Sequence, residues 1–189
     1  MTDYEKYKEL LMHRLNQKRY YHSLCVADEA KRLALKYGSD PERAYLAGLL
    51  HDITKNSNKE EHFEIFNNYN ISLSDIELKA EKLWHAISGA AYVKNKLKIS
   101  DEEIVDAIRY HTTAKSGMTL LQIILYLADF TSADRDYEDV EVIRKLTDKS
   151  LESGLKYALS YSIKDLIDQS KAVHPDTVDA YNEVVMKGM

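Results

Sequence analysis

The sequence predicts an all-α fold, and three observations carry this prediction. Six glycines and two prolines among 189 residues leave little turn chemistry for β-hairpins. No Asn-Gly or Asp-Gly pair separates two alternating apolar runs. Apolar residues instead recur at helical spacing along most of the chain. Since domains average roughly 150 residues, we expect one all-helical domain over residues 1–189.

The first part of the chain is expected to form three helices. Apolar periodicity predicts the first two helices, over residues 3–16 and 20–37. Asp40 is a favourable N-cap, and Pro41 suits the first position of a helix. These two residues therefore predict the start of a third helix, which we expect to reach Lys55.

Two capping boxes predict helix starts in the middle of the chain. Ser74 with Glu77 forms the first box, and Ser100 with Glu103 forms the second. Thr119 opens a later helix that is expected to end near Asp129. The helix that starts at Ser74 is expected to continue through Leu83 to Lys96, with a break near Trp84. The remaining expected elements are helices at 60–69, 140–146, 151–167 and 176–187, and polar loops at 56–59 and 131–139.

Composition and charge exclude several classes of function. A net charge of −5 and a pI near 5.8 provide no general attraction to nucleic acid or anionic membranes. The single cysteine, Cys25, cannot form an internal disulfide, and the N-terminus lacks an apolar signal core. The longest apolar run, 120–128, is far shorter than the roughly 20 residues of a bilayer span. We expect a cytoplasmic protein with no membrane segment and no nucleic-acid partner.

Histidines and aspartates fall on the apolar faces of the expected helices. His22, His51 and His111 continue apolar stripes, and Asp129 lies one turn after a stripe of leucines. A lone inward histidine is most often a satisfied core residue. A buried carboxylate is costly, however, so Asp52 and Asp129 beside inward imidazoles predict a bound cation. Mixed imidazole and carboxylate ligands suit Fe, Mn, Zn or Ni better than Mg or Ca.

The order of these residues resembles a known family. His22, the pair His51-Asp52, and Asp129 match the H…HD…D signature of HD-domain metal-dependent phosphohydrolases. Longer strings resemble the bacterial subgroup that hydrolyses diadenosine tetraphosphate symmetrically. These strings are AGLLHDITK (47–55), LWHAISGA (83–90), AIRYHTTAKSGMTLLQIILYLAD (107–129) and HPDTVDAYN (174–182). The chain lacks the proline that this subgroup carries before Arg135, although the spacing from Asp129 is kept.

The resemblance implies roles for particular residues in an HD-type helical bundle. It implies that His22, His51, Asp52 and Asp129 bind a metal, with Asp52 as the natural bridge between ions. His85 and His111 would bind either a second metal or the substrate phosphates. The implied substrate-binding residues are Lys55, Thr112, Arg135, His174 and Thr177. Each of these five also has a structural alternative, such as an exposed ion pair or a helix cap.

The expected activity follows from the same resemblance. It implies a hydrolase that uses iron, or else Mn, Zn or Ni, as one or two ions to cleave diadenosine tetraphosphate into two molecules of ADP. The generic signature alone also permits an HD-domain nucleotidase or a cyclic-nucleotide phosphodiesterase. An alternative from another class is a sensor that binds a nucleotide or metal without turnover. A homodimer is the default expectation for its assembly.

Overall fold

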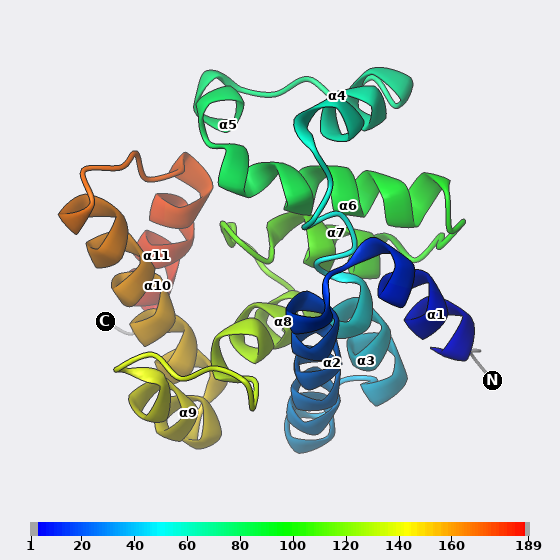
Figure 1. The fold of residues 1–189 in the computed structure, drawn as a ribbon. Helices are drawn as coiled ribbons and strands as arrows, with labels where there is room; N and C mark the ends of the chain where they lie inside the picture. Colours follow the sequence, from blue (N-terminus) through cyan, green and yellow to red (C-terminus); the bar gives the residue numbers. More distant parts are fainter. Residues whose placement is uncertain (1–3, 188–189) are drawn as a thin grey trace.

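A computed structural model describes residues 4–187, and those residues form helices joined by loops (Figure 1). Within this range there is no strand, which confirms the predicted fold class. The elements are α1 (Tyr4–Arg14), α2 (Gln17–Tyr37), α3 (Pro41–Leu50), α4 (Lys59–Asn68), α5 (Asp75–Lys79), the 3-10 helix η1 (Glu81–Leu83), α6 (Trp84–Asn95), α7 (Glu102–Tyr110), α8 (Leu120–Thr131), α9 (Val140–Lys149), α10 (Leu151–Asp168) and α11 (Pro175–Lys187). The expected start of the first helix at residue 3 lies outside the described residues.

Local capping signals explain several helix starts. Asp40 accepts hydrogen bonds from the backbone N–H groups of residues 42 and 43, with Pro41 at the first helical position, as predicted. The capping box of Ser74 and Glu77 is also confirmed. The box predicted at Ser100 is wrong, because Asp101 is the N-cap of α7 and accepts from the N–H groups of residues 103 and 104. The side chain of Asp101 is held there by two hydrogen bonds from Arg43.

The third helix is shorter than predicted. It ends at Leu50, and the next residues form tight turns, in which the N–H of Ile53 bonds to the carbonyl of Leu50 and that of Lys55 to the carbonyl of Asp52. The turns place His51 and Asp52 immediately after the helix, where their side chains reach the centre of the bundle. Apolar periodicity did not predict this ending, because Ile53 is buried just as a helical residue would be.

The helices that carry the predicted ligands share one core. A single buried cluster extends from Tyr7 in α1 to Ala180 in α11. At its centre α2, α3, α7 and α8 pack against one another, and α6 packs on α7. The helices α3 and α2 approach closely at Gly48, where an added Cβ would be 2.7 Å from the Cα of Ala27. This tight crossing fixes α3, and therefore the start of the His51 turn, relative to α2.

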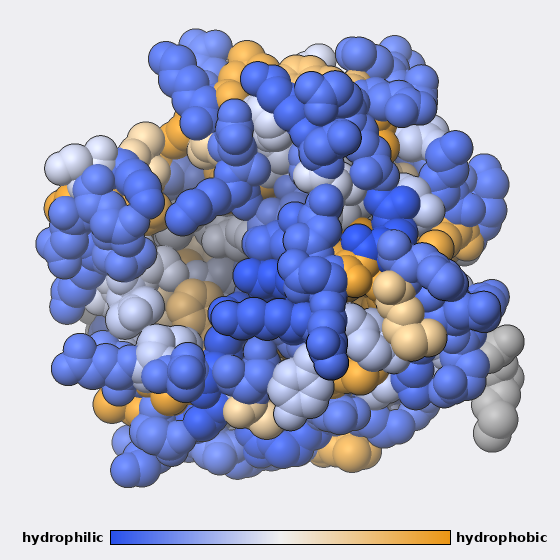
Figure 2. All heavy atoms as spheres, viewed as in Figure 1, coloured by the Kyte–Doolittle hydropathy of each residue, from blue (hydrophilic) through white to orange (hydrophobic). Residues whose placement is uncertain are grey.

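The peripheral helices surround this core. In Figure 1, α4 and α5 lie above α6, while α10 and α11 pack together on the left side of the molecule. Between the α10–α11 pair and the middle of the molecule, the surface is hollowed (Figure 2). None of the helices described in residues 4–187 is long and apolar enough to cross a membrane.

Candidate metal centre and adjoining cavities

Side chains from three segments meet at the middle of the bundle. His22 comes from α2, His51 from the turn after α3, and Asp129 from α8. The Nε2 atom of His22 lies 2.9 Å from Oδ1 of Asp129, and Nε2 of His51 lies 4.0 Å from that same oxygen. One donor atom from each residue is within 4.8 Å of the other two. These three residues form the first ligand group.

The rings of His51 and His111 are oriented by their own helices. In each ring, Nδ1–H donates to the carbonyl three residues earlier, at Gly48 and Ile108, over 2.7 Å. Each histidine directly follows the end of its helix, where the last carbonyls lack intrahelical partners. The bond to Nδ1 leaves the Nε2 lone pair facing the centre. Burial lowers the pKa of His51 to about 3, so this ring is a neutral imidazole suited to binding metal.

A second ligand group lies directly beside the first. Nε2 of His85 is 3.1 Å from Oδ1 of Asp52 and 3.1 Å from Nε2 of His111. Nε2 of His111 is 3.6 Å from that same oxygen of Asp52. The other oxygen of Asp52 lies 3.5 Å from Nε2 of His51 in the first group. Asp52 therefore faces both groups.

Two buried atoms in the centre have no hydrogen-bond partner. They are Nε2 of His51 and Oδ1 of Asp52, and both side chains are at most 2% exposed. Nε2 of His85 lies 3.1 Å from that oxygen of Asp52 but is not oriented to form a hydrogen bond with it. Leaving such groups unsatisfied costs about 1–3 kcal/mol each in a folded protein. Both atoms carry lone pairs that suit a transition metal. The residues present therefore fit the metal that the sequence analysis predicts.

Arginines at the rim compensate part of the carboxylate charge. Arg19, one turn before His22 in α2, places Nη1 3.0 Å from Oδ2 of Asp52. Arg135 forms an ion pair with the Asp129 carboxylate and donates from Nε to the Asp129 carbonyl over 2.7 Å. Burial alone would raise the pKa of both aspartates. The neighbouring histidines and Lys55 instead hold the pKa of Asp52 well below its usual range, and Arg135 and the neighbouring histidines do the same for Asp129.

Asp134 supports the ring of His22 from outside the ligand groups. Nδ1–H of His22 donates to Oδ2 of Asp134 over 2.8 Å, and the hydroxyl of Ser132 donates to the other oxygen of that carboxylate. A carboxylate behind a ligating histidine fixes the ring and strengthens it as a ligand. Sequence reasoning missed both Asp134 and Arg19. Arg19 lies at helical spacing from His22, which is a signal that could have identified it.

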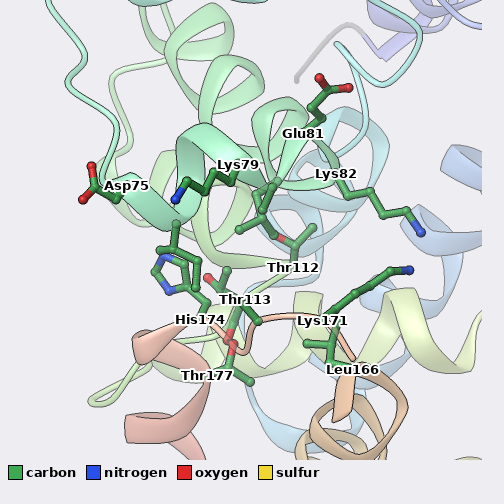
Figure 3. A pocket seen from close by; sticks show the side chains of 14 residues that line it. Asp75, Lys79, Glu81, Lys82, Thr112, Thr113, Leu166, Lys171, His174 and Thr177 are labelled. Atoms are coloured by element: carbon green, nitrogen blue, oxygen red, sulfur yellow. Dashed lines mark hydrogen bonds between the residues drawn. The ribbon is translucent and has the colours of Figure 1, made fainter. Parts of the chain in front are cut away.

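The predicted substrate-binding residues separate into two places. Lys55 and Arg135 lie at the metal centre, where Lys55 donates from Nζ to Nε2 of His85 over 3.0 Å. Thr112, His174 and Thr177 line a larger cavity of about 670 Å³ (Figure 3). The structure thus does not bring all five together.

Within the larger cavity, these three side chains differ in their hydrogen bonding. The hydroxyl of Thr177 donates to the carbonyl of Thr113 over 2.7 Å, which ties α11 to the loop after α7. Nδ1 of His174 accepts from the N–H of Asp176 over 3.2 Å, so this ring caps the start of α11. The hydroxyl oxygen of Thr112 is buried and has no partner. Among the three, Thr112 is the one with a buried side-chain atom that lacks a partner.

A smaller cavity of about 450 Å³ adjoins the metal centre. Its lining includes His85 from the second ligand group and His62 from α4, together with Arg19, Lys55, Ser57, Lys59, Glu81, Lys82 and Trp84. Nδ1 of His62 lies 2.8 Å from the hydroxyl of Ser88. Sequence reasoning assigned His62 nothing, because its neighbours in the chain are polar. Its burial comes from packing between α4 and α6.

Comparison with known proteins shows the family of this chain. The model of the HD domain family matches residues 19–134, which include every residue of both ligand groups. The chain belongs to the HD domain family. In this chain, α2, the turn after α3, and α8 bring together His22, the His51-Asp52 pair and Asp129, although these residues are far apart in the sequence.

Relatives of this HD-domain chain cover nearly its whole length. It is 33% identical over 179 residues to the symmetrical bis(5'-nucleosyl)-tetraphosphatase of Halalkalibacterium halodurans, with 95% of each chain covered. It is 35% identical over 171 residues to the Bacillus subtilis protein of that name, covering 90% of this chain and 91% of the relative. A crystal structure from Clostridium acetobutylicum, described as a predicted HD superfamily hydrolase involved in NAD metabolism, aligns with a TM-score of 0.94, 36% identity and 99% of each chain.

Proposed function

We propose that this HD-domain protein is a metal-dependent hydrolase that cleaves diadenosine tetraphosphate symmetrically into two molecules of ADP. The observation that carries the proposal is the pair of ligand groups that Asp52 faces, with a cationic cavity beside them that His85 helps to line. The names of the relatives from Halalkalibacterium and Bacillus support the choice of substrate.

The first ligand group, with Asp52, would hold one metal ion, and His85 and His111 would complete the site of a second. We propose iron as the resident metal, with Mn, Zn or Ni as alternatives that suit the same imidazole and carboxylate ligands. When bound, such a metal supplies an activated water and neutralises negative charge on the phosphoryl group. The residues around the ligands then have to bind and orient the substrate.

Three cations at the rim of the ligand groups suit a polyphosphate. Arg19, Lys55 and Arg135 all lie within 4 Å of the ligand carboxylates. Arginine can bind phosphate oxygens with two parallel hydrogen bonds, whereas lysine acts as a point charge. Phosphoryl transfer depends mainly on positioning the attacked phosphorus in line with the attacking and leaving oxygens. We assign that positioning to these three side chains.

Measured turnover distinguishes the proposed hydrolase from two alternatives. An HD-domain nucleotidase or phosphodiesterase would prefer mononucleotides or cyclic nucleotides, and a sensor would bind without reaction. The complete ligand set disfavours the sensor, because binding alone does not require both groups to be intact.

A substrate panel tests the proposal directly. Diadenosine tetraphosphate, AMP, cyclic AMP and NAD are each incubated with metal-loaded protein, and kcat/KM is measured. We expect the dinucleoside tetraphosphate to be preferred by at least a hundredfold. Asp52→Asn, which keeps the side-chain size but removes the charge, serves as the inactive control. Preference for a mononucleotide or cyclic nucleotide, or no turnover with any of the four metals, would overturn the proposal.

A further inference from the structure

The two cavities beside the metal centre share one wall. The residues of η1, Glu81 and Lys82, line both of them. The larger cavity reaches Thr112, which directly follows the ligand His111, and the smaller reaches His85. A substrate that extends from one cavity into the other would pass close to Thr112 and His85, next to the ligand groups. The two cavities differ in chemistry, so they are not equivalent sites for two identical halves.

The larger cavity suits a nucleoside. Its volume of about 670 Å³ is within the usual range for small-molecule sites, and much of its wall is apolar, formed by Ile76, Leu83, Leu166 and Ala172. Thr112 lies in the wall of this cavity, and its buried hydroxyl has no hydrogen-bond partner. Figure 3 shows Thr112 and Thr113 in the middle of this cavity, between η1 and the loop that leads into α11.

The smaller cavity suits phosphates instead. Four of its lining residues are cationic, namely Arg19, Lys55, Lys59 and Lys82, and Glu81 is its single acidic residue. A high local positive charge of this kind attracts polyanions. The larger cavity is lined by three lysines, Lys79, Lys82 and Lys171, against two acidic residues, Asp75 and Glu81, so its excess of positive charge is smaller. This difference indicates which part of the substrate each cavity takes.

The one large aromatic ring of the smaller cavity is not free to stack on a base. Trp84 is 3% exposed, and its Nε1 donates to the carbonyl of Glu77 over 2.7 Å. Phe63 packs edge-on against this ring, and the Lys59 ammonium lies over it at 5.6 Å. The cavity therefore provides charge for phosphates but no apolar cleft for an adenine.

We propose that the larger cavity binds the adenosine of the half that is attacked, while the smaller binds only the departing phosphates and does not recognise a second nucleoside. This inference rests on the proposed function. It assigns the chain a further activity, the hydrolysis of adenosine 5'-tetraphosphate to ADP and pyrophosphate. The water oxygen bonds to the second phosphorus from adenosine, and the bond from that phosphorus to the next bridging oxygen breaks. Pyrophosphate leaves with the bridging oxygen, and the proton from water is released to solvent.

The first experiment compares the two substrates on the metal-loaded full-length protein. We expect kcat/KM for adenosine tetraphosphate within tenfold of that for diadenosine tetraphosphate, with ADP and pyrophosphate in equal amounts. If diadenosine tetraphosphate is cleaved but adenosine tetraphosphate is more than tenfold slower, the second nucleoside is recognised and this inference is wrong, while the proposed function stands. If neither is cleaved, the proposed function itself fails.

The second experiment assigns the departing phosphates to one cavity. Lys59 lines only the smaller cavity and Lys79 only the larger, so Lys59→Gln and Lys79→Gln are matched variants. Inhibition by inorganic pyrophosphate is measured with the free metal concentration held constant. We expect Lys59→Gln to weaken this inhibition about tenfold, the usual loss for a hydrogen bond to a charged group, and Lys79→Gln to change it less than twofold. Equal effects, or a larger effect of Lys79→Gln, would contradict the assignment.

Discussion

At His22, the two ring nitrogens have separate tasks. Nε2 faces Asp129 within the first ligand group, and Nδ1–H is held by Asp134. The rings of His51 and His111 are oriented without a carboxylate, because a backbone carbonyl of the preceding helix accepts a hydrogen bond from Nδ1–H of each ring. The orientation of His22 thus depends on one side chain from the loop after α8, and that side chain can be removed experimentally.

Asp134→Ala is expected to weaken metal binding. The variant frees the His22 ring to rotate, and loss of such a supporting partner typically lowers metal affinity about 10–100-fold. Competition with a coloured chelator measures the affinity. Asp136→Ala, an exposed position in the same loop, is the control and is expected to bind metal as wild type does. Equal metal affinities of the two variants would show that Asp134 does not support metal binding by His22.

Asp52→Ala is expected to lose most of the metal. Asp52 faces both ligand groups, and its Oδ1 is buried without a hydrogen-bond partner. Elemental analysis of wild type and variant, purified without added metal, gives the metal content per chain. Circular dichroism checks that the variant remains helical. A folded variant with the wild-type metal content would show that Asp52 is not a ligand.

At the scale of the helix, the sequence predicted the elements that depend on local signals. The caps at Asp40 and Ser74 require only neighbouring N–H groups, and both are present as expected. The start of α7 was misplaced because Asp101 is held by Arg43, which is distant in the sequence. The end of α3 was misplaced because the turn at His51 depends on packing.

For the candidate site too, the sequence predicted what depends on local signals and missed what depends on contacts between distant residues. The ligand residues follow from a spacing that can be read along the chain. His62 and Asp134 do not, because each acts through a contact with a residue more than 20 positions away. The separation of Lys55 from Thr112 and His174 into different cavities also depends on how the helices pack.

The close crossing of α2 and α3 predicts that a side chain added at Gly48 destabilises the protein. Gly48→Ala places a methyl group 2.7–2.9 Å from backbone atoms of residues 26 and 27, which cannot move without shifting a helix. We expect it to lower the free energy of unfolding by about 1–3 kcal/mol, as measured by chemical denaturation. Gly89→Ala is the milder comparison, since its nearest neighbour is the side chain of Thr54 at 3.3 Å. A Gly48→Ala variant as stable as Gly89→Ala would contradict the tight crossing.

At the scale of the whole molecule, the ligand groups bring together helices from the two ends of the segment that matches the HD domain family. His22 lies in α2 and Asp129 in α8, and one buried cluster connects these helices to α1 and α11. A cytoplasmic location, a homodimer and a single domain over residues 1–189 stay predictions from the sequence.

Removal of the metal is expected to lower the stability of the whole chain. A ligand that binds only the folded state at a hundred times its Kd stabilises that state by about 2.7 kcal/mol. For a chain of this size, that corresponds to a fall in Tm of about 5–11 °C after treatment with chelator. Adding metal back should restore the Tm of wild type but not of Asp52→Ala. An unchanged Tm in wild type would mean that the ligand groups hold no metal.

The central claim is that this HD-domain centre cuts a four-phosphate bridge in the middle, and the products of diadenosine tetraphosphate test it most directly. The bridge contains three anhydrides, and only cleavage of the central one gives two identical nucleotides. Attack at the second phosphorus from the bound adenosine requires one ADP half to be held as a unit. Chromatography of an early time point, before any product reacts further, is expected to show ADP as the sole nucleotide product. AMP and ATP in equal amounts would contradict the account.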